Sequence, residues 1–255
     1  MTEIEELGSR IRGCHRCRLA RTRRHALAGE GDPGSRIMLV ALSPGEKEDR
    51  RNRMFIGPSG EVLNRLLNAA RVKREEVYMT NLIKCNLPKN RRPRRDEIES
   101  CRIFLDQEIN LIKPAVIVPL GFYATRYVLQ KFHASVPETR RDFATIYGKL
   151  VYSSDQKIFP LPHPASLLYN PAFEPATRKQ YRKLRVFLHP CRRFSSCPLN
   201  RFCRQGRVDP KWMEQYCRGD WESCRRFILE EQGKSHPDCM LPDGSLNQWL
   251  ECEWE

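Results

Sequence analysis

The chain has 255 residues, of which 45 are Lys or Arg and 31 are Asp or Glu, so its formal net charge is +14. Such an excess of positive charge predicts a surface that attracts polyanions, nucleic acid first. No apolar run approaches the roughly 20 residues of a membrane span and no charged-then-apolar leader opens the chain, so we expect a cytoplasmic protein without a membrane anchor.

Apolar runs of the kind seen in parallel strands with both faces covered recur along the first three quarters of the sequence. They are residues 36–42, 77–79 and 115–121, followed by a shorter pair near 149–151 and 157–161. Helical apolar patterns alternate with them at residues 62–70, 96–112, 123–132 and 177–188. This alternation predicts a three-layer α/β/α fold with a mostly parallel central sheet.

Polar residues follow several of these runs directly. Ser43-Pro44-Gly45 follows the first run, Asn81 the second and His163 the last. Ligands of open α/β sheets bind at the carboxyl ends of the strands, so we expect these residues to form one site. Asn81 offers a carbonyl acceptor and an amide donor, which can pair with the edge of a flat heterocycle, although an Asn after a strand is also a common capping residue.

The chain contains eleven cysteines, an odd number that in a reducing compartment favours metal binding over disulfides. Cys14 and Cys17 have the spacing of two ligands to one metal centre, and Cys85 is a further candidate ligand. The spacing of this pair alone fits zinc, a redox dithiol or an iron–sulfur cluster.

Residues 189–255 have no strong strand pattern and hold seven of the eleven cysteines. We expect a small, mainly helical module that lacks an adequate core without a metal or packing on the main domain. The candidate ligands of a second centre, zinc or iron–sulfur, are Cys197, Cys203, Cys217 and Cys224, with Cys191 competing with Cys203 for one position. Free thiols in a helical appendage are the alternative.

Over roughly residues 1–188 the chain resembles the iron–sulfur uracil-DNA glycosylases, the fourth family of that superfamily. The resemblance rests on eight motifs in a fixed order: Cys14-x-x-Cys17, Gly29-Glu30-Gly31, Pro44-Gly45-x-x-Glu48-Asp49, Phe55-Ile56-Gly57, Thr80-Asn81-Leu82-Ile83-Lys84-Cys85, Asn90-Arg91, Glu97-x-x-x-Cys101 and His163-Pro164-Ala165-x-Leu167-Leu168. It implies a 4Fe-4S cluster bound by Cys14, Cys17, Cys85 and Cys101, since cysteine thiolates are the ligands of such clusters. Zinc with the same ligands is the alternative.

The resemblance also implies a DNA repair enzyme that flips uracil out of DNA and hydrolyses its glycosidic bond. Phe55 is then expected to stack on the base, and Asn81 to pair with its O4 and N3-H edge. His163 is expected to donate a hydrogen bond to O2 as negative charge develops there. The loop of Leu42, Ser43, Pro44 and Gly45 forms another wall of the site.

The attacking water and the DNA require further groups. The carboxylate candidates for positioning the water are Glu48 and Asp49, and the candidate DNA contacts are Arg91, Arg92, Ser166, Leu167 and Leu168, with the two leucines filling the vacated stack. Each role has a plain structural alternative: Phe55 as core, the two carboxylates as a helix-start pair, and the leucines as packing. No Lys is placed as a nucleophile, so we expect a monofunctional, monomeric enzyme.

The sequence departs from the family at two positions. Leu42 replaces the Glu of the usual Gly-Glu-Ala-Pro-Gly motif, and Tyr169 stands where Arg is common. Losing a carboxylate at the site predicts a rate loss on the order of a hundredfold or more. It also leaves open a preference for hypoxanthine or xanthine, and a non-catalytic sensor of deaminated bases.

Overall fold

The computed structural model describes residues 2–153, 156–250 and 252. The chain divides into two compact units, Met1–Arg182 and Lys183–Glu255. The boundary expected from the sequence, after residue 188, lies a few residues further along.

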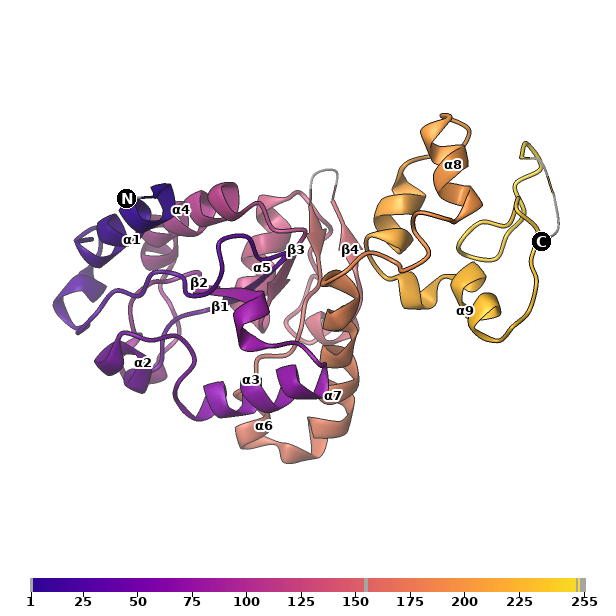
Figure 1. The fold of residues 1–255 in the computed structure, drawn as a ribbon. Helices are drawn as coiled ribbons and strands as arrows, with labels where there is room; N and C mark the ends of the chain where they lie inside the picture. Colours follow the sequence, from indigo (N-terminus) through magenta and orange to yellow (C-terminus); the bar gives the residue numbers. More distant parts are fainter. Residues whose placement is uncertain (1, 154–155, 251, 253–255) are drawn as a thin grey trace. The chain divides into compact units, whose positions relative to one another are not determined.

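The first unit contains a five-stranded sheet of order β2-β1-β3-β5-β4 (Figure 1). The strands are β1 (Ile37–Ala41), β2 (Val77–Asn81), β3 (Val116–Pro119), β4 (Val151–Tyr152) and β5 (Lys157–Ile158). All neighbours pair in parallel except β4 and β5, which are antiparallel. Every residue of β1, β2 and β3 is buried, which explains the apolar character of β1, of β3 and of the first three residues of β2. The predicted mostly parallel α/β architecture is confirmed.

Seven α-helices accompany this sheet in the described part of the first unit. They are α1 (Glu3–Arg12), α2 (Glu46–Arg51), α3 (Pro58–Ala69), α4 (Arg95–Ile112), α5 (Phe122–Lys131), α6 (Ser166–Tyr169) and α7 (Glu174–Arg182). Helix α1 packs on α4, and α3 packs on α7. Helix α3 begins at Pro58, because the fixed φ of proline suits the first helical turn, and Gly57 is its N-cap residue. Val62, Leu63 and Leu66 then form the buried face of the helix.

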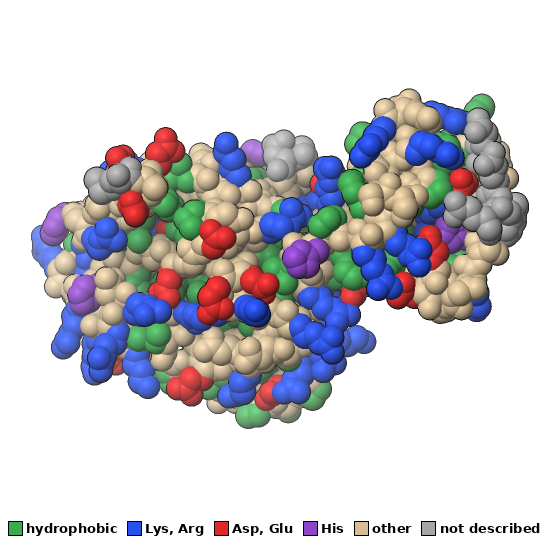
Figure 2. Space-filling view, in the orientation of Figure 1, with side chains coloured by type: hydrophobic (Ala, Val, Ile, Leu, Met, Phe, Trp, Pro, Cys, Tyr) green, Lys and Arg blue, Asp and Glu red, His purple; other side chains and the backbone are tan. Residues whose placement is uncertain are grey.

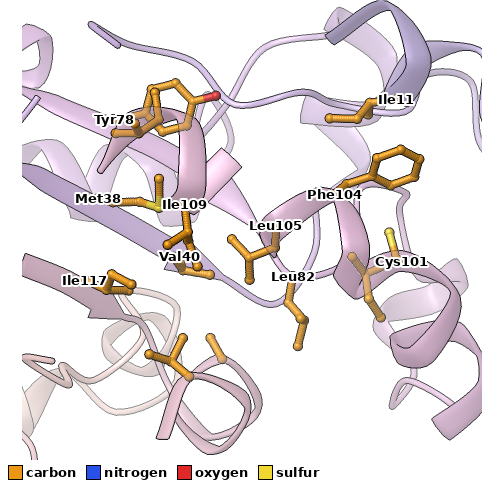
Figure 3. Close-up of a cluster of buried hydrophobic side chains, with 14 of the residues drawn as sticks. Ile11, Met38, Val40, Tyr78, Leu82, Cys101, Phe104, Leu105, Ile109 and Ile117 are labelled. Carbon is orange, nitrogen blue, oxygen red and sulfur yellow. The ribbon is translucent and has the colours of Figure 1, made fainter. Parts of the chain in front are cut away.

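One face of the sheet packs against α1, α4 and α5 in a continuous apolar cluster (Figure 3). Met38 and Val40 of β1 and Tyr78 of β2 lie in this cluster with Leu105 and Ile109 of α4. Successive side chains of a strand point to opposite faces, so Asn81 lies on the face opposite to that of Tyr78. The fold therefore directs Asn81 away from this core.

In its described residues the second unit contains the helices α8 (Pro198–Arg204) and α9 (Arg225–Glu231) and three short helical segments, Lys183–Phe187, Met213–Cys217 and Trp221–Ser223. Its core is a separate small cluster that includes Leu199, Phe202 and Met213. Cys239 and Cys252 form a disulfide. For this pair, the expectation that the cysteines serve metal binding in place of disulfides is wrong.

Within the residues described in both units, no helix has the length and apolar character needed to cross a membrane.

Candidate active site

A cavity of about 490 Å³ opens at the carboxyl ends of the parallel strands. Leu42, Ser43, Pro44 and Gly45 line it after β1, as expected from the sequence, and Asn81 lines it at the end of β2. His163, which follows β5, lies on the same cavity. Parallel strands bring their carboxyl ends to one edge of the sheet, and this edge is where the chain gathers its polar side chains.

Phe55 lines the cavity in an unusual backbone conformation. Its φ is 49°, in the left-handed region that bulky residues rarely adopt. Its ring centroid lies 6.5 Å from that of His163. Gly60 permits this turn, since a Cβ there would lie 1.8 Å from the Phe55 carbonyl oxygen. The loop thus sets an aromatic ring beside an imidazole.

Two carboxylates and a guanidinium hold this loop in place. Glu48 Oε1 accepts hydrogen bonds from the backbone N-H groups of Ile56 (3.0 Å) and Gly57 (2.7 Å). Glu30 accepts from the N-H of Met54 at 2.9 Å, and Arg74 donates to the Phe55 carbonyl at 3.3 Å. These bonds offset the strain of the left-handed residue and fix the Phe55 ring.

His163 is held as a hydrogen-bond donor. Its Nδ1 accepts a hydrogen bond from the backbone N-H of Ala165 at 3.1 Å, which assigns the proton of the neutral ring to Nε2. Burial lowers the pKa of His163 to about 4, so the ring is neutral at pH 7. A neutral imidazole with its N-H at Nε2 can stabilise a developing oxyanion by donating a hydrogen bond.

Asn81 is 2% exposed and meets the cavity through its amide. Its Nδ2 lies 3.3 Å from the sulfur of Met54, a weak acceptor. A heterocycle carbonyl would be a stronger partner for this amide than the thioether is. The contact therefore orients Asn81 without tying up its hydrogen-bonding capacity.

The two candidate carboxylates differ in position. Glu48 is the only carboxylate among the described residues that line the cavity. The Asp49 carboxylate instead accepts hydrogen bonds from the backbone N-H groups of Arg24 (3.0 Å) and His25 (3.1 Å). Asp49 thus secures the N-terminal segment, and Glu48 is the one of the two carboxylates that lines the cavity.

Of the two predicted arginine contacts, only Arg91 lines the cavity in the described chain. Its Nη1 donates to Glu97 at 2.9 Å, and this hydrogen bond, with that from the Arg94 N-H, lowers the pKa of the buried Glu97. Arg92 is exposed beside it. Figure 2 shows Lys and Arg side chains distributed over the visible face of the first unit, with acidic side chains between them.

The two leucines predicted to enter the DNA stack have different environments in α6. Leu167 is 4% exposed and belongs to the core, whereas Leu168 is 46% exposed and lines the cavity with Tyr169. Ser166 donates its hydroxyl to the His163 carbonyl at 2.7 Å. Leu168 is therefore the leucine that reaches the cavity, and Leu167 packs α6 on the core.

Sequence reasoning missed Tyr123 and Arg140 as lining residues of the cavity. Tyr123 could have been found, because it follows the third apolar run just as Asn81 follows the second. Arg140 had no such signal. It comes from a loop beyond α5 and lies over the ring of Phe122, 5.2 Å from its centroid.

Cys14, Cys17, Cys85 and Cys101 line a second, smaller cavity of the first unit. Arg23 donates to the Cys85 sulfur at 3.1 Å, and the backbone N-H of Lys84 donates to that of Cys101 at 3.2 Å. Within residues 2–153, 156–250 and 252, no group of three or more His, Cys, Asp or Glu is placed to hold a metal ion. Four cysteines around one small cavity, with N-H donors on the sulfurs of Cys85 and Cys101, are a donor set that fits an iron–sulfur cluster.

In the second unit, Cys191, Cys197, Cys217 and Cys224 line another common cavity. Cys203, predicted from the sequence as the fourth member, is not among the described residues that line it, and packs on the small core instead. The sequence left Cys191 and Cys203 as competitors, and the structure brings Cys191 to the other three.

The structure is thus an α/β protein with an amide, an imidazole and an aromatic ring around one cavity at the strand ends, a set of groups that can hold a flat heterocycle. Residues 28–185 match the family model described as the uracil DNA glycosylase superfamily, and the chain belongs to this superfamily.

Among its curated relatives are enzymes named type-4 uracil-DNA glycosylase. The one from Saccharolobus solfataricus is 34% identical over 74% of this chain and 88% of the relative. The one from Sulfurisphaera tokodaii is 35% identical over 72% and 84%, and the one from Thermotoga maritima is 34% identical over 66% and 84%. The match to the family model, residues 28–185, lies almost wholly within the first unit.

Proposed function

We propose that this chain is a monofunctional DNA repair glycosylase that hydrolyses the N-glycosidic bond of uracil in DNA. The observation that carries the proposal is the convergence of Phe55, Asn81 and His163 on one cavity, in a chain of the uracil DNA glycosylase superfamily. The substrate is DNA, single-stranded or with uracil opposite guanine, and the protein acts as a monomer.

The cavity binds the base after it leaves the helix, because an atom inside a duplex is out of reach of side chains. The Phe55 ring stacks on the flipped base, and the Asn81 amide pairs with O4 and N3-H. Cytosine presents the reverse donor and acceptor pattern at these two positions. An amide held in one orientation therefore disfavours cytosine, since a mismatched buried polar group is left unpaired.

Bond cleavage leaves negative charge on the departing uracil and positive charge on the sugar. The Nε2-H of His163 donates to O2, a hydrogen bond that strengthens as the charge develops. Because the ring is neutral, it stabilises the leaving group by hydrogen bonding, without transferring a proton. Glu48 and Ser43 are the groups on the cavity wall that orient the water.

Cys14, Cys17, Cys85 and Cys101 bind a 4Fe-4S cluster in this proposal. When bound, such a cluster would supply a structural link and no redox step. Cys14 and Cys17 of the N-terminal segment, Cys85 before the basic loop at Arg91 and Cys101 of α4 would then be held together. Loss of this link would release the Arg91 loop and weaken DNA binding before it affected the strands.

A second function rests on Leu42, which lines the cavity where the family pattern has Glu. With an apolar side chain there, the protein could bind deaminated bases without turnover, or prefer hypoxanthine or xanthine. The retained Phe55, Asn81 and His163 favour the uracil enzyme.

The test uses labelled oligonucleotides that contain uracil, hypoxanthine or xanthine, each single-stranded and opposite its natural partner. Alkali cleavage after incubation reports abasic sites. We expect release of uracil and at most slow release of the other bases. Selective binding of modified strands with no base released, by protein whose cluster is intact, would support the sensor and contradict the enzyme.

A further inference from the structure

The four-thiol cavity of the second unit is built from two separate parts of the chain. Cys191 and Cys197 come from the segment before α8, and Cys217 and Cys224 come from the segment before α9. The backbone N-H of Cys191 donates to the Cys217 carbonyl at 2.7 Å, which ties the two parts together. Two segments that are separated in the sequence thus bring their cysteines to one cavity.

Arg226 lies on the same cavity and is 1% exposed. Its Nη1 donates to the carbonyls of Asp238 and Met240 at 2.9 Å, whereas its Nε and Nη2 atoms are buried without a hydrogen-bond partner. The Asp238 carboxylate is 4.0 Å from Nη2, beyond hydrogen-bonding distance. Arg226 therefore forms an ion pair with Asp238 without a hydrogen bond, and its two buried donor atoms favour additional negative charge in the cavity.

A set of metal-bound thiolates would supply that negative charge. The remaining walls include the apolar side chains of Phe194, Trp221 and Phe227, and the ion pair of Arg193 with Glu230 at 2.6 Å.

The lining of this cavity is similar to that of the cysteine cavity in the first unit. In each, four cysteines and two arginines lie around one small cavity. The four cysteines of the first unit are the ligands of the proposed 4Fe-4S cluster, and the same donor set fits a cluster here.

We propose that Cys191, Cys197, Cys217 and Cys224 bind a second iron–sulfur cluster, with Arg226 as the buried cation that offsets its negative charge. The small core of the second unit then gains a covalent crosslink between its two halves, which a unit of this size needs for stability. This assignment goes beyond the glycosylase activity and does not depend on it.

The experiment measures iron, acid-labile sulfide and zinc in the full chain purified without oxygen. The wild type is compared with Cys217→Ser and Cys224→Ser, and with Cys203→Ser as the matched control from the same unit. We expect Cys217→Ser and Cys224→Ser to lose about two to four iron atoms per chain, with matching sulfide. Cys203→Ser should keep the wild-type content.

A variant of the first cavity, Cys85→Ser with Cys101→Ser, provides a second readout that does not require the second unit to tolerate a substitution. It should retain about two to four iron atoms and the visible absorption of a cluster. A chain that loses all its iron in this variant, or one that contains zinc in the second unit in place of iron, would overturn the proposal. Base release by the wild type is measured in a separate experiment, so the iron content tests the second cluster whether or not the chain releases uracil.

Discussion

The tautomer and charge of His163 decide what the cavity can do to a leaving base. The hydrogen bond from the Ala165 N-H fixes the donor at Nε2, and burial keeps the ring neutral. The sequence placed His163 at the end of a strand but left its charge open, because the charge depends on how the surrounding loops pack. This is a property that no local pattern contains.

A pH dependence of stability follows from this neutral ring. His163 has a pKa of about 4 in the folded chain, below its unfolded value near 6.5, so between these pH values the unfolded state binds more protons. The free energy of unfolding should therefore decrease as pH falls from 6.5 to 4. Urea unfolding of wild type and of His163→Gln at pH 7 and pH 4.5 measures this decrease. If both proteins lost the same free energy of unfolding between the two pH values, the lowered pKa of His163 would be contradicted.

The two leucines of α6 give a matched pair of variants. Leu168→Ala removes an exposed side chain at the cavity and should slow uracil release from duplex DNA about tenfold, with a smaller effect on single strands, which have no stack to fill. Leu167→Ala removes a buried side chain and should lower the free energy of unfolding by about 2–5 kcal/mol. Single-turnover rates on both substrates and urea unfolding separate the two effects. If the two variants showed the same rates and the same free energy of unfolding, the separate roles of Leu167 and Leu168 would be contradicted.

At the scale of elements, the sequence predicted the three long strands and the helices between them, since buried parallel strands read as apolar runs. It did not predict how the loops after them are held. The loop at Phe55 depends on Glu30 and Glu48, which come from before β1 and from α2. Long-range hydrogen bonds of this kind leave no mark in local periodicity. Asp49 follows Glu48 in the sequence but accepts hydrogen bonds from Arg24 and His25 in the N-terminal segment, and local periodicity could not predict this difference either.

A buried ion pair joins β2, α4 and the chain between them. Lys84 and Glu108 are each 1% exposed, and Glu108 also accepts from Thr80 at 2.6 Å and from the Gly29 N-H at 2.9 Å. Lys84→Met leaves the Glu108 charge uncompensated and should lower the free energy of unfolding by about 3–5 kcal/mol.

The double variant Lys84→Met with Glu108→Gln tests the cause of this loss. The amide removes the unpaired charge and keeps an acceptor for the Gly29 N-H. It should therefore recover part of the stability lost in Lys84→Met, as measured by urea unfolding. A double variant less stable than Lys84→Met alone would show that the charge is not the cause.

At the scale of the whole molecule, the net charge of +14 predicted a polyanion partner, and the superfamily supplies DNA as that partner. Binding should weaken with salt, since each phosphate contact releases counterions. For Arg92→Ala the slope of log K against log salt should become shallower by about one. Arg102→Ala, on α4 and paired with Glu99 at 2.7 Å, is the control and should keep the wild-type slope. If Arg102→Ala made the slope shallower and Arg92→Ala did not, the DNA would bind a different surface from the one at Arg92.

The second unit marks the limit of what the sequence could predict. Seven cysteines in a short region indicated a metal site, but spacing alone could not separate Cys191 from Cys203 or set aside Cys239 and Cys252 as a disulfide. Which thiols meet depends on how two segments cross. The buried Arg226 likewise becomes visible only when the chain is folded.

The single-turnover rate of uracil release tests the central claim most directly, with wild type, His163→Ala and Leu42→Glu measured side by side on one duplex with uracil opposite guanine. We predict measurable release by wild type, a loss on the order of 10²–10³-fold in His163→Ala, and a gain on the order of a hundredfold in Leu42→Glu. If His163→Ala released uracil as fast as wild type, the hydrogen bond at O2 would not be the source of catalysis, and the account of this cavity would be wrong.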